Sequence, residues 1–168
     1  MNQPLTPFYA TYSPQLPELL LSLNCSIAIT TYQAGKVVFI SPNPDKERLT
    51  TLPRTFSKPM GIDVNGNRML IALKDEVILL ENSVELATYY PNKQNVYDSL
   101  WLPRVTYYTG QVDMHDIAFG DDGIYAINTS FSKLIHSRMN SRSSMVMKSQ
   151  GTLSVLATVT KLTAINTL

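Results

Sequence analysis

The stretch GIDVNGNRMLIAL, residues 61–73, carries the pattern that decides the fold. Two runs of apolar and β-branched residues flank Asn65-Gly66-Asn67, and Asn-Gly pairs supply the positive φ angles that tight β-hairpins need. Two more stretches have this form, SIAITTYQAGKVVFIS at residues 26–41 and DIAFGDDGIYAIN at residues 116–128. The sequence therefore predicts three antiparallel β-hairpins.

The three hairpins form a weak internal repeat. Superposing Ile27, Ile62 and Ile117 aligns apolar residues two positions further on and a second apolar strand after each turn. The offsets along the chain are 62 − 27 = 35 and 117 − 62 = 55, which bracket the spacing of a four-stranded propeller blade. The repeat favours a β-propeller over a β-sandwich, the competing all-β architecture.

The segments between the hairpins supply further strands. RLTTL at residues 48–52, EVILLEN at 76–82 and VELATYY at 84–90 are predicted strands. Residues 91–113 are predicted to be an excursion from the sheets, and long loops of this kind are usually functional or form an interface. We therefore expect an all-β, β-propeller-like chain that forms a partial ring of about three antiparallel blades.

The two ends of the chain differ from its middle. Leucines at helical spacing after Pro14 predict one short helix within an N-terminal extension, residues 1–25. Residues 26–136 hold the predicted blades, and residues 137–168 form a divergent basic tail that is rich in Ser and Thr and has no acid. Three hairpins make about half of a closed ring, so we interpret the chain as a truncated or frameshifted fragment of a longer propeller. We expect an exposed sheet edge near residues 124–135 that favours self-association.

The composition limits which partners the protein is expected to bind and which cellular compartment it is expected to occupy. With 14 basic and 13 acidic residues the net charge is +1, so no overall field attracts nucleic acid or an anionic membrane. Cys25 is the only cysteine and cannot form an intramolecular disulfide. The N-terminus has no basic start, and its short apolar run contains Glu18, which fits neither a signal peptide nor a membrane span. We therefore expect a cytoplasmic protein.

Three stretches of the sequence resemble a conserved family whose function is unknown. They are TTYQAGKVVFI (30–40), FSKPMGIDV (56–64) and LPRVTYYTGQVDMHDIAFGDDGIYAINTSFSKL (102–134). They are similar to an uncharacterised conserved bacterial family, a domain of unknown function that is predicted to form a β-propeller. The resemblance implies this fold and a chain about twice as long, but no chemistry. At Lys133 the sequence departs from the family pattern, where a cysteine is expected.

Candidate site residues gather around the start of the third hairpin. Alternation places Asp113, His115, Ile117 and Phe119 on one face of the predicted strand, where Asp113 and His115 suit a divalent ion or acid/base chemistry. The alternative is that these groups have a structural role and fix the end of a strand by hydrogen bonds. Aromatic residues nearby suit stacking on a sugar, although in a strand-rich protein such residues more often form the core between blades. The candidate ligand-binding residues are Tyr107, Tyr108, Asp113, His115, Asp116 and Asn128, with Trp101 as a further aromatic.

The sequence does not require an enzyme. It has no phosphate-binding glycine loop, no Gly-x-Ser-x-Gly nucleophile motif and no paired Cys or His ligands, so we assign no catalytic residue, metal or cofactor. The function predicted is a non-catalytic module that binds a small molecule or a protein. The alternative is a metal-assisted hydrolase or lactonase-type propeller in the intact ancestor, with Asp113 and His115 as ligands and Asn128 as an oxygen donor. Asp121-Asp122-Gly123 is interpreted as a turn rather than a calcium loop.

Overall fold

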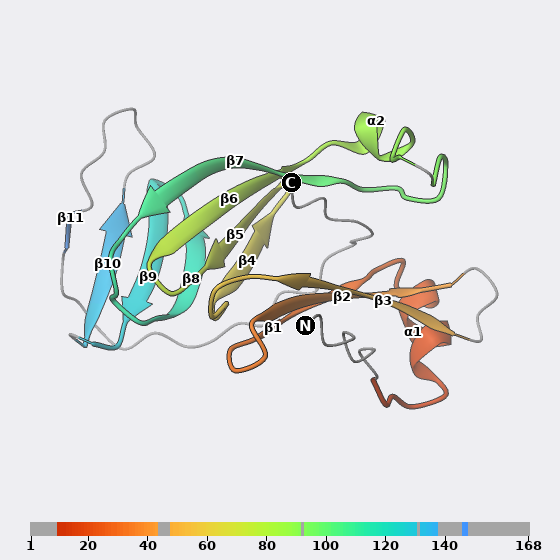
Figure 1. Ribbon diagram of the computed structural model, residues 1–168, viewed down its shortest axis with the longest axis horizontal. Coiled ribbons are helices and arrows are strands. Elements are labelled where there is room, and N and C mark those ends of the chain that lie inside the picture. The colour runs from red at the N-terminus through yellow and green to blue at the C-terminus, as the bar shows by residue number, and fades with distance from the viewer. Residues whose placement is uncertain (1–9, 44–47, 92, 131, 138–145, 148–168) are drawn as a thin grey trace, which may run out of the picture.

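The computed structural model describes residues 10–43, 48–91, 93–130, 132–137 and 146–147, and most of them lie in three antiparallel sheets (Figure 1). The first sheet comprises β1 (Ile27–Thr31), β2 (Lys36–Pro42) and β3 (Leu49–Thr55). The second comprises β4 (Ile62–Asn65), β5 (Arg68–Ala72), β6 (Glu76–Asn82) and β7 (Trp101–Tyr108). The third comprises β8 (Met114–Gly120), β9 (Gly123–Asn128), β10 (Lys133–Ser137) and β11 (Val146–Met147). The helices are α1 (Leu16–Ser22) and α2 (Val84–Ala87).

The three predicted hairpins and the all-β class are confirmed. β1 pairs with β2, β4 with β5 and β8 with β9, each in antiparallel register. Gly66 in the β4–β5 turn has a φ of 61°, a left-handed conformation that glycine adopts without steric cost. Asp121 and Asp122 form the β8–β9 turn, as predicted. Residues close in the sequence thus determine these pairings.

Two predictions for the second sheet are wrong, namely the strand at 84–90 and the excursion at 91–113. The predicted strand at 76–82 is confirmed as β6, but residues 84–87 form α2 instead of a strand. β6 must end at Asn82, because Asn82 Oδ1 accepts a hydrogen bond from the Leu100 N–H at 2.9 Å, and the Ser83 N–H donates to the Leu100 oxygen at 2.8 Å. The chain leaves the sheet at this point and returns to it at β7, so the excursion is residues 83–100 and not 91–113 (Figure 1).

The β1–β2 hairpin corresponds in geometry to the β9–β10 hairpin. In both, a left-handed residue precedes the lysine that begins the next strand: Gly35 (φ 59°) precedes Lys36, and Ser132 (φ 51°) precedes Lys133. β9 and β10 are the second and third strands of their sheet, whereas β1 and β2 are the first and second described strands of theirs. The predicted superposition, which aligned β1 with β4 and β8, is compatible with the chain order, since each of these is the first described strand of its sheet. A strand–turn–strand pattern recurs between any two neighbouring strands, so the pattern does not reveal which pair it is.

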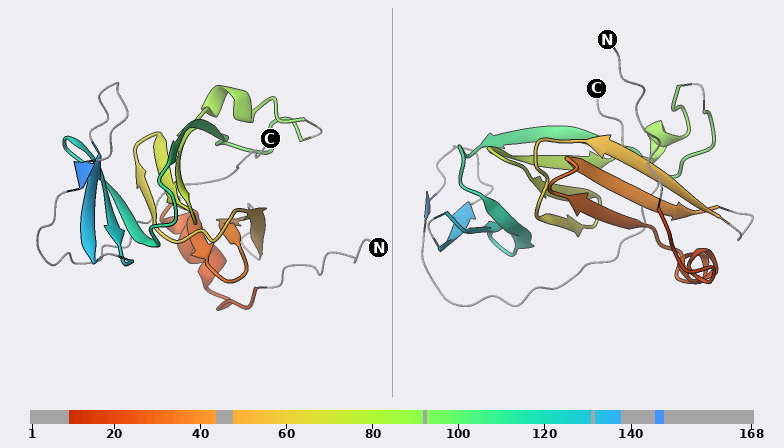
Figure 2. Two further views of the ribbon diagram at one scale, coloured as in Figure 1. Left: turned by 60° about the vertical axis from the view of Figure 1, so that its left-hand side comes forward. Right: turned by 60° about the horizontal axis from the view of Figure 1, so that its bottom comes forward.

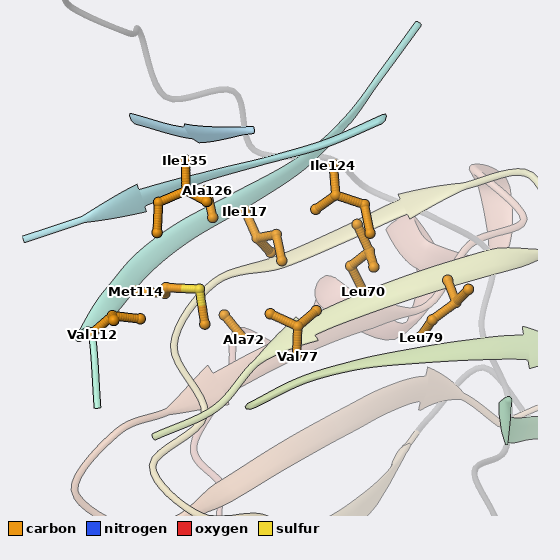
Figure 3. Packing of buried hydrophobic residues seen from close by; sticks show 10 residues of the cluster. All are labelled: Leu70, Ala72, Val77, Leu79, Val112, Met114, Ile117, Ile124, Ala126 and Ile135. Atoms are coloured by element: carbon orange, nitrogen blue, oxygen red, sulfur yellow. The ribbon is translucent and has the colours of Figure 1, made fainter. Parts of the chain in front are cut away.

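The second sheet lies between the other two and shares a core with each (Figure 2). Its strand β5 is buried on both faces, since the side chains of Met69, Leu70, Ile71 and Ala72 have no exposed surface. Met69 and Ile71 face the first sheet, where they pack with Phe39 of β2. Leu70 and Ala72 face the third sheet. That second core consists of Leu70, Ala72, Val77, Leu79, Val112, Met114, Ile117, Ile124, Ala126 and Ile135 (Figure 3).

Strands β4 and β8 approach each other closely at Gly61. A Cβ atom at position 61 would lie 2.7 Å from the Ile117 nitrogen and 2.8 Å from the Asp116 carbonyl carbon, so only glycine fits there. Two positions later the Asp63 carboxylate accepts a hydrogen bond from the Phe119 N–H at 2.7 Å. This backbone contact and this side-chain bond join the second sheet to the third.

Helix α1 covers part of the first sheet. Pro17 lies in its first turn, where a missing N–H costs nothing, and the predicted N-terminal helix is confirmed. Leu20 is buried as α1 packs against β2, whereas Leu19 and Leu23 are more than half exposed. Only one side of the predicted leucine face is therefore in the core.

The sheet edge predicted near residues 124–135 is not an edge. β9 pairs with β8 and β10, and β10 also pairs with β11 at Ile135 and His136. In the described residues the end strands of the sheets are β1, β3, β4, β7, β8 and β11. Most of the predicted tail lies outside the described residues, so the domain boundaries at 25 and 136 stay predictions.

Candidate functional site

The predicted site residues meet where the second and third sheets are joined. We call this region the loop rim and define it as residues 74–76, 108–116 and 128–130. The Thr109 N–H donates to the Asp75 oxygen at 2.9 Å, which attaches the end of β7 to the β5–β6 turn. Beyond it, Val112 and Met114 turn inward to pack near Ala72 and Val77 (Figure 3). The rim is thus a surface layer held down by a buried apolar base.

Of the three candidate aromatic residues only Tyr108 is available to a ligand. Successive side chains of β7 point to opposite faces, so Tyr107 packs on the core between the second and third sheets while Tyr108 is 86% exposed. Trp101 is 1% exposed and packs between the first and second sheets. Its indole Nε1 has no hydrogen-bond partner in the described part of the chain. The stacking interpretation therefore applies to Tyr108 alone.

The predicted alternation along β8 is wrong because a β-bulge interrupts it. Met114 pairs with Asn128 and Asp116 pairs with Ile127, so His115 is the extra residue. Met114 and Ile117 consequently lie in the same core, although they are three positions apart. His115 does not share the Ile117 face; its side chain is exposed at the rim.

Asp113 ties the start of β8 to the β9–β10 turn. Its φ of 42° turns the chain sharply, and its backbone oxygen accepts bonds from the Thr129 N–H at 3.1 Å and the Thr129 hydroxyl at 2.9 Å. Its carboxylate accepts a further bond from the Ser130 hydroxyl at 3.2 Å. Asp113 therefore has the structural role that the sequence offered as an alternative, in which a polar group fixes the start of a strand by hydrogen bonds.

The remaining candidates are not freely exposed. The Asp116 carboxylate is half-buried and accepts the Ile117 N–H at 2.9 Å. Asn128 has no exposed surface and lies on β9, between β8 and β10. The structure thus brings all six candidates into one region, but of the six only Tyr108, Asp113 and His115 are exposed to solvent.

The rim is acidic. It contains Lys74 and four carboxylates, Asp75, Glu76, Asp113 and Asp116, which gives 1 − 4 = −3 with His115 neutral. Within the described ranges, no three side chains of His, Cys, Asp or Glu come together in a way that could hold a metal ion. The rim therefore offers an exposed phenol ring among hydrogen-bond acceptors.

The sequence did not reveal a small cavity that lies between α1 and the end of β2. Its volume is about 120 Å³, and its wall includes Cys25, Asp98 and two buried serines, of which Ser26 donates a hydrogen bond to Ser41 at 2.9 Å. Binding sites for organic ligands usually measure about 300–1,000 Å³, so this cavity has room for a few water molecules only. No local signal could reveal it, because Asp98 is far from Cys25 in the sequence.

A second feature that the sequence did not reveal lies on the outer face of the third sheet. The rings of Tyr125 and His136 stack with centroids 4.4 Å apart and planes 19° apart. The Tyr125 hydroxyl donates to Asp122 Oδ1 at 2.7 Å, and His136 Nε2 lies 3.1 Å from the same oxygen. These contacts fasten the β8–β9 turn to β10.

One of three comparisons with known proteins found a match, to a family model without a described activity. A family model described as a domain of unknown function (DUF4915) matches residues 14–150. No curated protein matches the chain, and no solved structure matches it. Neither helix in the described part of the chain is long and apolar enough to cross a membrane.

Proposed function

For a chain that belongs to the family of domains of unknown function (DUF4915), we propose the role of a non-catalytic binding module built from propeller-type blades, with the loop rim as its recognition surface. The family match supplies no chemistry, so the proposal depends on the geometry of the sheets and of the rim. A cytoplasmic location is part of it, because the buried free thiol of Cys25 needs no oxidising compartment.

The arrangement of the sheets supports the assignment of blades. The second and third sheets are four-stranded meanders in which each strand pairs with its neighbours in the sequence. The chain passes from the last strand of one sheet, β3 or β7, to the first strand of the next, β4 or β8. Consecutive sheets pack face to face through shared cores, as blades do around a propeller axis.

Tyr108 is the observation that carries the binding role. An exposed tyrosine ring offers a flat apolar face, and it stands where carboxylates supply acceptors for hydroxyl or ammonium groups. Sugars and amino sugars combine an apolar ring face with such donors. We therefore expect a carbohydrate or a similar polyhydroxylated ligand at the rim.

The hydrolase alternative has less support. It needs Asp113, His115 and Asn128 as a converging ligand set, but Asn128 is fully buried and Asp113 is bonded to the β9–β10 turn. A bulge turns His115 outward, away from Asn128. A binding role requires none of these three groups to converge.

An oligosaccharide array with neutral and amino-sugar members tests the proposal. We expect binding by the wild-type chain, loss of binding in Tyr108→Ala and unchanged binding in Tyr89→Ala. Tyr89 is the matched control because it is 74% exposed but lies next to α2, outside the rim. Absence of binding by the wild-type chain, or equal loss in both variants, would contradict the proposal.

A further inference from the structure

A basic surface adjoins the loop rim on the side of the first sheet. The described part of this sheet and of the loop that follows it, residues 26–43 and 48–62, contains four basic residues and no Asp or Glu. Two of the four, Lys36 and Lys58, lie with Tyr32 at the end of the sheet where β2 begins and β3 ends. We call these three residues the basic end.

Backbone hydrogen bonds connect the basic end to the loop rim. The Phe56 N–H donates to the Gly35 oxygen at 3.0 Å, which joins the loop after β3 to the β1–β2 turn. The Lys74 N–H donates to the Ser57 oxygen at 3.0 Å, which joins that loop to the β5–β6 turn. Lys74 is also the first residue of the rim, so the surface changes from basic to acidic between it and the two carboxylates that follow it.

The lysines of the basic end are held by hydroxyl groups rather than by carboxylates. Lys58 Nζ donates to the Tyr32 hydroxyl at 3.3 Å and lies 5.2 Å from the centre of the Tyr32 ring. Lys36 Nζ donates to the Thr55 hydroxyl at 2.5 Å. In the part of the chain that the structure describes, no carboxylate pairs with either lysine. The hydroxyl groups thus orient both ammonium groups and leave their charge available to an anion.

Lys58 also has an unusual backbone conformation. It lies in the loop between β3 and β4 and is left-handed, with a φ of 47°. Residues other than glycine rarely adopt this conformation, and those that do cluster at ligand-binding and other functional sites. Pro59, the next residue, is buried and anchors the loop. The conformation of Lys58 is therefore a second observation that favours binding at the basic end.

We propose that the basic end is a second subsite beside the loop rim, and that it binds the carboxylate of a uronic acid in an acidic oligosaccharide whose other units lie on Tyr108. The inference rests on the proposed function and names its ligand class more closely. A carboxylate accepts hydrogen bonds from ammonium groups at both of its oxygens, and a tyrosine ring offers an apolar face to a sugar. Both tyrosines are exposed, Tyr32 at 42% and Tyr108 at 86%. They belong to neighbouring sheets, which pack about 10 Å apart, so a ligand that contacts both must have several sugar units.

Calorimetric titration of the full chain with two matched ligands tests the proposal. One ligand is a tetrasaccharide of N-acetylglucosamine units that ends in a single glucuronic acid, and the other is the same molecule with its carboxylate reduced to an alcohol. At low salt the wild type should bind the acidic form about tenfold tighter, because charge-assisted hydrogen bonds are added. In the double variant Lys36→Gln, Lys58→Gln the two forms should differ by about twofold or less, since those bonds are lost, and the reduced form should bind as it does to the wild type.

Lys93→Gln is the matched control. Lys93 also lies over a tyrosine ring, 5.8 Å from the centre of Tyr97, but it belongs to the excursion between β6 and β7 and to neither surface. Its variant should keep the wild-type preference for the acidic form. Unchanged binding of the reduced form shows that the double variant is folded.

The outcomes separate this subsite from the proposed function of the rim. If the wild type binds both forms equally, or if the preference for the acidic form survives in the double variant, the subsite is overturned and the rim proposal stands. If the wild type binds neither form, both proposals fail. If the preference is lost in the double variant but Tyr108→Ala weakens the binding of neither form, the rim proposal fails and the subsite stands.

Discussion

Replacing Gly61 by alanine should weaken the junction between the second and third sheets. The new Cβ would lie 2.7 Å from the Ile117 nitrogen and 2.8 Å from the Asp116 carbonyl carbon and Cα. Carbon contacts are comfortable at about 3.5–4.0 Å, so the strands must separate by up to about 1 Å. All three atoms belong to the backbone and cannot rotate aside as a side chain would.

The cost follows from the cores that the separation opens. Overpacking costs about 1–3 kcal/mol, and contact with backbone atoms places Gly61→Ala at about 3 kcal/mol. Alanine also restricts the unfolded chain, which offsets about 0.5 kcal/mol. The net loss of about 2.5 kcal/mol should lower the unfolding temperature by about 5–10 °C for a domain of this size.

Thermal unfolding followed by circular dichroism, with Gly66→Ala as the control, measures this effect. Gly66 has a φ of 61°, and no atom lies within 4 Å of the position that its Cβ would take, so its alanine variant carries backbone strain of about 1 kcal/mol and no clash. The Phe119 amide, which donates to Asp63 at 2.7 Å, should exchange faster in Gly61→Ala but not in Gly66→Ala. If Gly61→Ala is no less stable than Gly66→Ala, the close approach of β4 and β8 is refuted.

Three further predictions concern single side chains, and urea unfolding measures all of them. Asp63→Ala should cost about 1.5–3 kcal/mol, because it removes a charged acceptor from the Phe119 amide; a loss below about 0.5 kcal/mol would be inconsistent with that bond. Trp101→Phe should stay within about 1 kcal/mol of wild type, since the smaller ring removes an indole N–H without a partner in the described residues, whereas Trp101→Ala should cost about 3–5 kcal/mol. His115→Ala should change stability by less than about 0.5 kcal/mol, while Ile117→Ala should cost about 2–5 kcal/mol; a large effect at His115 would contradict its exposed position in the bulge.

Much of the fold was predictable because its signals are local. The Asn65-Gly66-Asn67 turn and the apolar run at 76–82 specify their hairpin and strand through a few neighbouring residues. The errors at 84–90 and 91–113 have another origin. β6 ends where Asn82 bonds to Leu100, and that contact joins residues 18 positions apart.

The sequence predicted where the candidate site residues lie, but not which of their side chains are exposed to solvent. The six residues do gather in one region, because they flank one strand start and its neighbour. Alternation assigned His115 to the same face as Ile117, yet the bulge opposite Asn128 separates them. A bulge depends on the pairing of two strands, so no property of one strand reveals it.

By itself the sequence determined the hairpins, the all-β class and the short N-terminal helix, because turn residues and apolar periodicity act over a few positions. Only the tertiary structure decided which of the candidate side chains reach solvent. It also showed that Gly61 is held against β8 by the backbone of residues 116 and 117. These features depend on packing between segments tens of residues apart, where the burial of a shared core selects one arrangement among many with the same local pattern.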